Sequence, residues 1–144
     1  VAEDLIERCR SEERLMISWS RYDFHLLDSA VDEPYKTRLG ELYRDGKYTA
    51  KRWNSLLGIG IASPHSLSKY MKELAWDPPE ETAENTVGNN IRYLRPYLER
   101  GDEWPIFTEG QKEKWRHVLK HNRHDLNGME RVVAKCSKRI QEHL

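Results

Sequence analysis

Leu15-Met16-Ile17-Ser18-Trp19-Ser20 is the stretch that decides the fold class of this chain. A short apolar run with an alternating tail is typical of a buried β-strand, and no other segment shows that pattern as clearly. We therefore predict one strand over residues 15–20. A lone strand needs partners in a sheet. Because the sequence offers no second strand, and because the chain starts at Val1 already in helical sequence, we expect further strands upstream.

The rest of the chain is predicted to be helical. The spacing of apolar residues favours helices over residues 2–12, 24–31 and 80–100, and two short helices within residues 35–57 that divide near Asp45-Gly46. A last amphipathic helix is expected to run to the C-terminus, with an apolar face that includes the following residues: Trp115, Val118, Leu119, Leu126, Met129, Val132 or Val133, Cys136 and Ile140.

Several local signals predict where these helices begin and end. Ser63-Pro64 has the form of an N-cap followed by proline at the first helical position, and Asp77-Pro78-Pro79 ends the helix that follows. Pro96 predicts a kink or a split within residues 80–100, and Gly101 a stop after them. Thr108-Glu109-Gly110-Gln111 has the capping-box pattern, so the last helix should begin there.

The composition excludes some classes of function. The chain has 144 residues, enough for one domain over residues 1–144, and its 24 basic and 24 acidic residues give a formal net charge of zero. Net charge therefore does not imply a general affinity for polyanions. The two cysteines, Cys9 and Cys136, are too few for a disulfide framework and are expected to be buried thiols. No apolar run reaches about 18 residues and no signal peptide is evident, so we expect a cytoplasmic protein without a membrane partner.

Asp125, His121 and Asp23 are the candidate catalytic residues. Asp125 follows His121 by four residues, so the two share one face of the last helix, and Asp23 comes directly after the predicted strand. Two carboxylates from distant segments suit Mg²⁺ or Mn²⁺, and an imidazole beside them suits proton transfer. Surface charges, helix caps and a solvent-facing histidine are the structural alternatives. A zinc site built on the histidines of this helix is not expected, since no further ligand stands at a known spacing.

Candidate nucleic-acid-binding residues occur in two places. Trp53 stands beside Lys51 and Arg52, and an aromatic ring next to cations is typical of surfaces that stack on bases. Asn122 and Arg123 lie next to His121 in the last helix and are the second group. Trp19 and Trp115 are expected in the core instead, because their spacing places them on apolar faces.

Two segments resemble motifs of the RNase H-like DEDD-type exonucleases, a family of predicted 3′–5′ exonucleases. Residues 15–27 resemble the second motif, in which a strand end presents an aspartate, and His121-Asn122-Arg123-His124-Asp125 resembles the third. Ser63-Pro64-His65-Ser66-Leu67-Ser68-Lys69-Tyr70 is similar to a helix start that lies between them. The resemblance covers roughly residues 1–140, as the C-terminal portion of the family's domain, and implies an RNase H-like α/β fold.

The resemblance also implies roles for single residues. Asp23 and Asp125 would be ligands of Mg²⁺ or Mn²⁺, and His121 takes the position of the tyrosine that orients the attacking water. The family's first motif, Asp-x-Glu, has no counterpart here and would lie upstream of Val1. The implied activity is therefore two-metal phosphodiester hydrolysis by the intact protein, with this chain alone inactive.

Two other functions remain open. One is a non-catalytic helical module that binds nucleic acid or protein through residues 35–57 and 80–100, and the other is a structural domain of a larger enzyme. The sequence does not distinguish DNA from RNA. If the sheet is incomplete, the free edge of residues 15–20 favours self-association.

Overall fold

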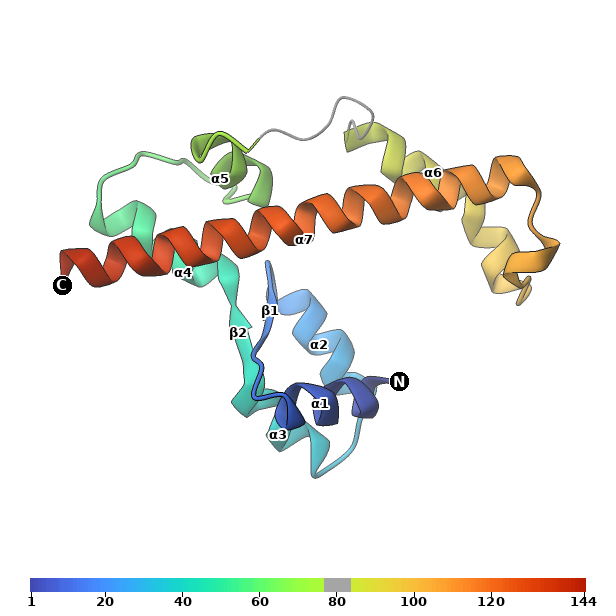
Figure 1. The fold of residues 1–144 in the computed structure, drawn as a ribbon, viewed down its shortest axis with the longest axis horizontal. Coiled ribbons are helices and arrows are strands. Elements are labelled where there is room, and N and C mark those ends of the chain that lie inside the picture. The colour runs from blue at the N-terminus through green and yellow to red at the C-terminus, as the bar shows by residue number, and fades with distance from the viewer. Residues whose placement is uncertain (77–83) are drawn as a thin grey trace. The chain divides into compact units, whose positions relative to one another are not determined.

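The computed structural model describes residues 1–76 and 84–144 and is mostly helical, with a small parallel sheet (Figure 1). Its elements in chain order are α1 (Ala2–Ser11), β1 (Met16–Ser18), α2 (Arg21–Ser29), α3 (Tyr35–Leu42), β2 (Tyr43–Asp45), α4 (Gly46–Leu56), α5 (Leu67–Glu73), α6 (Glu84–Glu99), the 3₁₀ turn η2 (Trp104–Ile106) and α7 (Glu109–His143). They form two compact units. The first unit is Val1–Leu74 with Met129–Leu144, and the second is Ala75–Gly128. Helix α7 contributes to both units.

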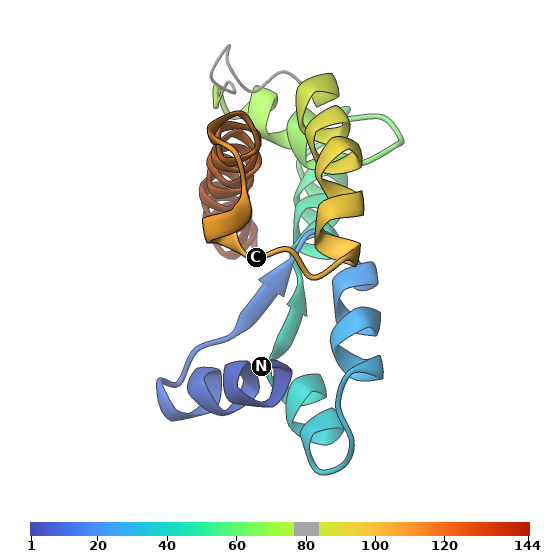
Figure 2. The same cartoon turned by 90° about the vertical axis from the view of Figure 1, so that its right-hand side faces the viewer.

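The expectation of a single strand is wrong, because β1 has a partner inside the chain. Strands β1 and β2 run parallel, with Met16 opposite Tyr43 and Ser18 opposite Asp45, and Figure 2 shows both arrows pointing the same way. The residues between the strands form α2 and α3, the helical crossover that parallel strands require. β1 is also shorter than the predicted strand over residues 15–20.

Strand β2 occupies the point where two helices were predicted to divide, near Asp45-Gly46. The division is confirmed, since α3 ends at Leu42 and α4 begins at Gly46. The side chain of Asp45 caps α4 by accepting a hydrogen bond of 3.1 Å from the backbone N–H of Tyr48. Tyr43 anchors the other end of the strand, because its hydroxyl lies 2.6 Å from Ser18 Oγ and donates to the carbonyl of Ser20 at 2.9 Å.

The core of the first unit has two parts. Ile6 from α1, Leu39 from α3 and Val31, which lies between α2 and α3, form one buried cluster. The second part contains the fully buried ring of Tyr70, whose centroid lies 5.4 Å from that of Trp19. The buried face of the C-terminal part of α7 was predicted correctly at the following residues: Met129, Val132, Cys136 and Ile140.

Helix α5 begins later than predicted. It starts at Leu67 with Ser66 at the N-cap, not at Ser63-Pro64. Tertiary contacts hold His65 ahead of the helix, because its carbonyl accepts a 3.1 Å hydrogen bond from Trp19 Nε1 and its Nδ1 lies 2.8 Å from the Tyr70 hydroxyl. The expected helix end at Asp77-Pro78-Pro79 lies outside the described residues.

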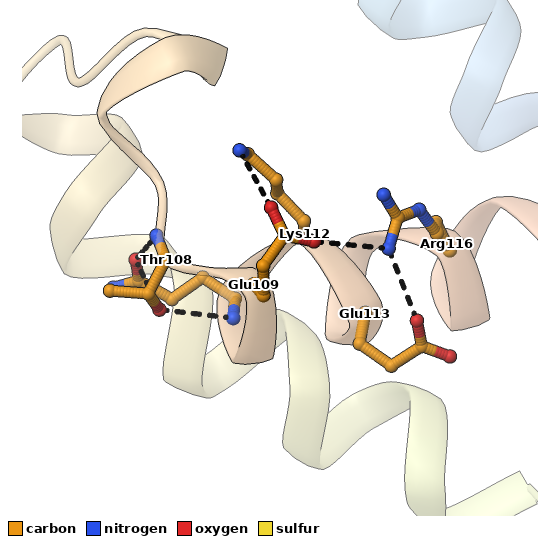
Figure 3. A network of polar contacts seen from close by, with 6 residues as sticks. Thr108, Glu109, Lys112, Glu113 and Arg116 are labelled. Carbon is orange, nitrogen blue, oxygen red and sulfur yellow. Dashed lines mark hydrogen bonds and ion pairs between the residues drawn. The ribbon is translucent and has the colours of Figure 1, made fainter.

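The second unit contains α6, η2 and the first part of α7. Helix α6 continues through Pro96 without the split that the sequence favoured, and Gly101 follows it at φ +77°, as a helix stop requires. The capping box is confirmed: Thr108 N donates to Gln111 Oε1 at 2.7 Å, and Gln111 N donates to Thr108 Oγ1 at 3.3 Å (Figure 3). Leu119 and Leu126 were expected on an apolar face, but they are 58% and 52% exposed.

The described helices include none with the combination of length and apolar character that crossing a membrane requires. Both cysteines are free thiols; Cys136 is buried as expected, whereas Cys9 is half-buried.

Candidate functional site

Asp23 lies in the first turn of α2 in the first unit, and its residue is exposed. The positive end of the helix macrodipole favours a carboxylate in this position. An aspartate at position 23 therefore has two explanations. It stabilises the start of α2, or it binds the metal ion that the sequence predicts.

His121 and Asp125 are brought together by α7, as their four-residue spacing predicts. His121 Nε2 lies 3.2 Å from Asp125 Oδ2, and the two side chains are 19% and 42% exposed. Asn122 and Arg123 are exposed beside them. An imidazole in contact with a carboxylate can be oriented by it and can exchange a proton with a bound water.

The metal site stays a prediction. Asp23 belongs to the first unit and Asp125 to the second. Across residues 1–76 and 84–144, no group of three or more histidine, cysteine, aspartate or glutamate side chains is arranged to hold a metal ion.

Trp53 does not form the base-stacking surface predicted for it. It is 5% exposed, on the face of α4 that also buries Ala50, and its ring centroid lies 6.3 Å from that of Tyr70. A ring packed in the core cannot stack on a base. The prediction is wrong because proximity in sequence to Lys51 and Arg52 does not place Trp53 on their side of the helix.

Tyr48 is the aromatic residue that accompanies these cations. Tyr48, Lys51 and Arg52 stand at positions i, i+3 and i+4 of α4 and so share one face. All three are exposed, Tyr48 at 67%. Within the described part of the chain neither Lys51 nor Arg52 is held in an ion pair. We call these three residues the α4 surface.

The α4 surface borders a groove of about 310 Å³ in the first unit. One wall comes from Tyr48, Thr49 and Arg52. The other comes from the last turns of α7, through Ser137, Ile140, Gln141 and Leu144. An exposed ring, an unpaired guanidinium, a hydroxyl and an amide thus converge on one hollow, which suits a ligand that has both flat faces and polar groups.

Comparison of the chain with protein-family models, with curated proteins and with solved structures gives no match. The resemblance to RNase H-like exonucleases therefore stays a prediction, and function has to be inferred from residues and their geometry.

Proposed function

We propose that this chain is a helical module that binds single-stranded nucleic acid through the α4 surface. The observation that carries the proposal is the exposure of Tyr48 on the same face as the unpaired cations Lys51 and Arg52. Base stacking on an aromatic side chain contributes about 1–3 kcal/mol per base, and it requires bases that are not enclosed in a duplex. Cations beside the ring neutralise the adjoining phosphates.

The chain has a formal net charge of zero, which limits how strongly it can attract nucleic acid. Long-range attraction to a polyanion is absent, so binding depends on local contacts rather than on an overall field. Two cations and one ring make a small site. We therefore expect weak affinity, a preference for single strands and a shallow dependence on salt.

The test is fluorescence anisotropy with labelled single-stranded and duplex oligonucleotides at several salt concentrations. Tyr48→Ala should weaken single-strand binding by about 5- to 150-fold, the equivalent of one stacked base. Lys51→Gln and Arg52→Gln should each lower the slope of log K against log salt by about 0.7.

Matched controls separate the α4 surface from general effects. Tyr22 on α2 is 68% exposed, almost the same as Tyr48, so Tyr22→Ala removes an equivalent ring elsewhere. Trp53→Phe should leave affinity unchanged, because Trp53 is buried and cannot reach a bound base. Equal losses for Tyr22→Ala and Tyr48→Ala, or tighter binding to duplex than to single strands, would contradict the proposal.

A second candidate function is Mg²⁺- or Mn²⁺-dependent phosphodiester hydrolysis, favoured by the 3.2 Å contact between His121 and Asp125. Its test is incubation of an end-labelled oligonucleotide with the purified chain and Mn²⁺. Any cleavage by this chain should disappear in Asp125→Asn, while binding to the α4 surface persists. Cleavage that survives the substitution contradicts a catalytic role for Asp125.

A further inference from the structure

Two amide side chains are buried in the second unit, and they differ in how their hydrogen bonds are satisfied. Asn90 and Gln111 are each 7% exposed. Gln111 is engaged by the capping box, where its Oε1 accepts from both the N–H and the hydroxyl of Thr108. The carboxamide of Asn90 forms no hydrogen bond with any residue that the structure describes. The side-chain nitrogen and oxygen of Asn90 are not among the fully enclosed atoms that lack a partner, so they face accessible space where a ligand can bind them.

Asn90 lines a pocket of about 400 Å³ between α6 and the first turns of α7, which we call the α6–α7 pocket. The other lining residues come from α7: Gly110, Glu113, Lys114 and His117. A volume of about 300–1,000 Å³ is usual for sites that hold small molecules. The unsatisfied carboxamide and the hollow therefore occur at the same place.

The charges around the pocket favour an anion. Glu113 is its carboxylate, and Arg116 Nη1 offsets that charge at 3.3 Å (Figure 3). The adjacent Glu109 is likewise held, by Lys112 at 3.0 Å. Lys114 is in no ion pair among the described residues, and its Nζ lies 5.0 Å from the ring centroid of Tyr93.

The backbone at Gly110 adds to the positive electrostatic potential at the pocket. Gly110 is the second residue of α7, where a helix leaves its N–H without an intrahelical acceptor and carries partial positive charge. A Cβ built on Gly110 meets no atom within 4 Å, so the backbone here faces open space. His117, two turns along the helix, contributes a ring that can donate a hydrogen bond.

We propose that the α6–α7 pocket binds a mononucleotide. Its phosphate is held by Lys114, His117 and the first turn of α7, and its base pairs through one edge with the carboxamide of Asn90. A phosphate alone would use only the N–H donors of that carboxamide, whereas a base edge with adjacent donor and acceptor satisfies its oxygen as well. The inference goes beyond the α4 surface, because it concerns a different unit and needs none of the same residues.

The test is a ¹H–¹⁵N NMR titration of the full chain with the four ribonucleoside monophosphates, and with adenosine and inorganic phosphate as separate arms. We expect one nucleotide to bind at least tenfold more tightly than either fragment. Asn90→Leu, which keeps the side-chain volume and removes the amide, should weaken that nucleotide at least tenfold. Lys114→Gln should weaken the nucleotide but not adenosine.

Asn89→Leu is the matched control, because Asn89 is the exposed neighbour whose Oδ1 accepts from Arg92 at 3.1 Å. It should leave nucleotide affinity unchanged. The proposal is overturned if no nucleotide binds at millimolar concentration, if inorganic phosphate binds as tightly as the nucleotides, or if Asn90→Leu retains full affinity. If Asn90→Leu fails to fold, Asn90→Asp takes its place, because it keeps a polar side chain and places a negative charge against the anion. Asn90→Asp should likewise weaken nucleotide binding at least tenfold.

Discussion

Gly46 begins α4 where three elements of the first unit approach one another closely. A Cβ built on this glycine would lie 3.0 Å from Val133 Cγ2, 3.1 Å from the carbonyl oxygen of Ser18 and 3.3 Å from Ile17 Cγ2. Carbon atoms pack comfortably at about 3.5–4.0 Å. The carbonyl belongs to the backbone of β1 and cannot rotate away. We therefore predict that Gly46→Ala destabilises the fold.

The magnitude follows from two opposing effects. Overpacking a well-filled site costs about 1–3 kcal/mol. Replacing glycine by alanine restricts the unfolded chain and returns about 0.4–1 kcal/mol. The two ranges combine to a net loss for Gly46→Ala of about 0–2.6 kcal/mol. The middle of that range, about 1.3 kcal/mol, corresponds to a fall in melting temperature of about 3–6 °C for a chain of this size.

Gly40 supplies a control of opposite sign. It lies inside α3, and a Cβ built there meets no atom within 4 Å. Gly40→Ala should therefore stabilise the protein by about 0.5–1 kcal/mol, since only the favourable effect remains. Comparison of the two variants removes the part of the change that comes from the unfolded state.

The assay is urea unfolding followed by circular dichroism, with wild type, both single variants and Gly46→Ala combined with Val133→Ala. Truncating Val133 should cost less in the Gly46→Ala background than in wild type, because it removes the closest clash. The midpoints should shift without a change in the denaturant slope. If Gly46→Ala raises stability as much as Gly40→Ala does, the close approach of β1, α4 and α7 at this point is refuted.

Two further predictions concern the capping box and a buried thiol. Thr108→Ala removes the hydroxyl that accepts from Gln111 N, so urea unfolding should show a loss of about 1 kcal/mol that Thr108→Ser largely avoids. Burial raises the pKa of the Cys136 thiol from an ordinary value of 9.0 to about 11. Because the folded state holds this proton more tightly, the stabilisation is complete below pH 9 and is lost as the pH rises from 9 to about 11. Cys136→Val should flatten that decline when unfolding is measured at pH 7.5 and 10.5, and a decline equal to that of wild type would contradict the assignment.

The parts of the fold that local chemistry determines were predictable from the sequence. The side chains of Thr108 and Gln111 each accept a hydrogen bond from the backbone N–H of the other residue. The start of α7 is therefore determined by residues within one turn. Strand β2 was missed because its structure depends on distant residues. It has only three residues, and Tyr43 holds it through hydrogen bonds to Ser18 and Ser20, which stand more than twenty positions away.

The α4 surface was predictable in part, and its error has a geometric cause. Lys51 and Arg52 are exposed, as the predicted binding role requires, but the aromatic ring beside them was assigned to Trp53, their neighbour in sequence. Successive residues of a helix point about 100° apart, so the ring on the same side must be sought three or four positions away. Tyr48 stands four before Arg52 and is the exposed ring, whereas Trp53 follows Ala50 into the core.

The α6–α7 pocket illustrates what sequence patterns cannot reveal. Asn89 and Asn90 are adjacent and identical in type, yet one is exposed and the other is 7% exposed. No local rule distinguishes them, because burial depends on how α6 packs against α7. The carboxamide of Asn90 has no hydrogen-bond partner among the described residues, and its polar atoms are not fully enclosed. They are therefore open to a ligand in the α6–α7 pocket, and this difference from Asn89 arises only from the packing of the two helices.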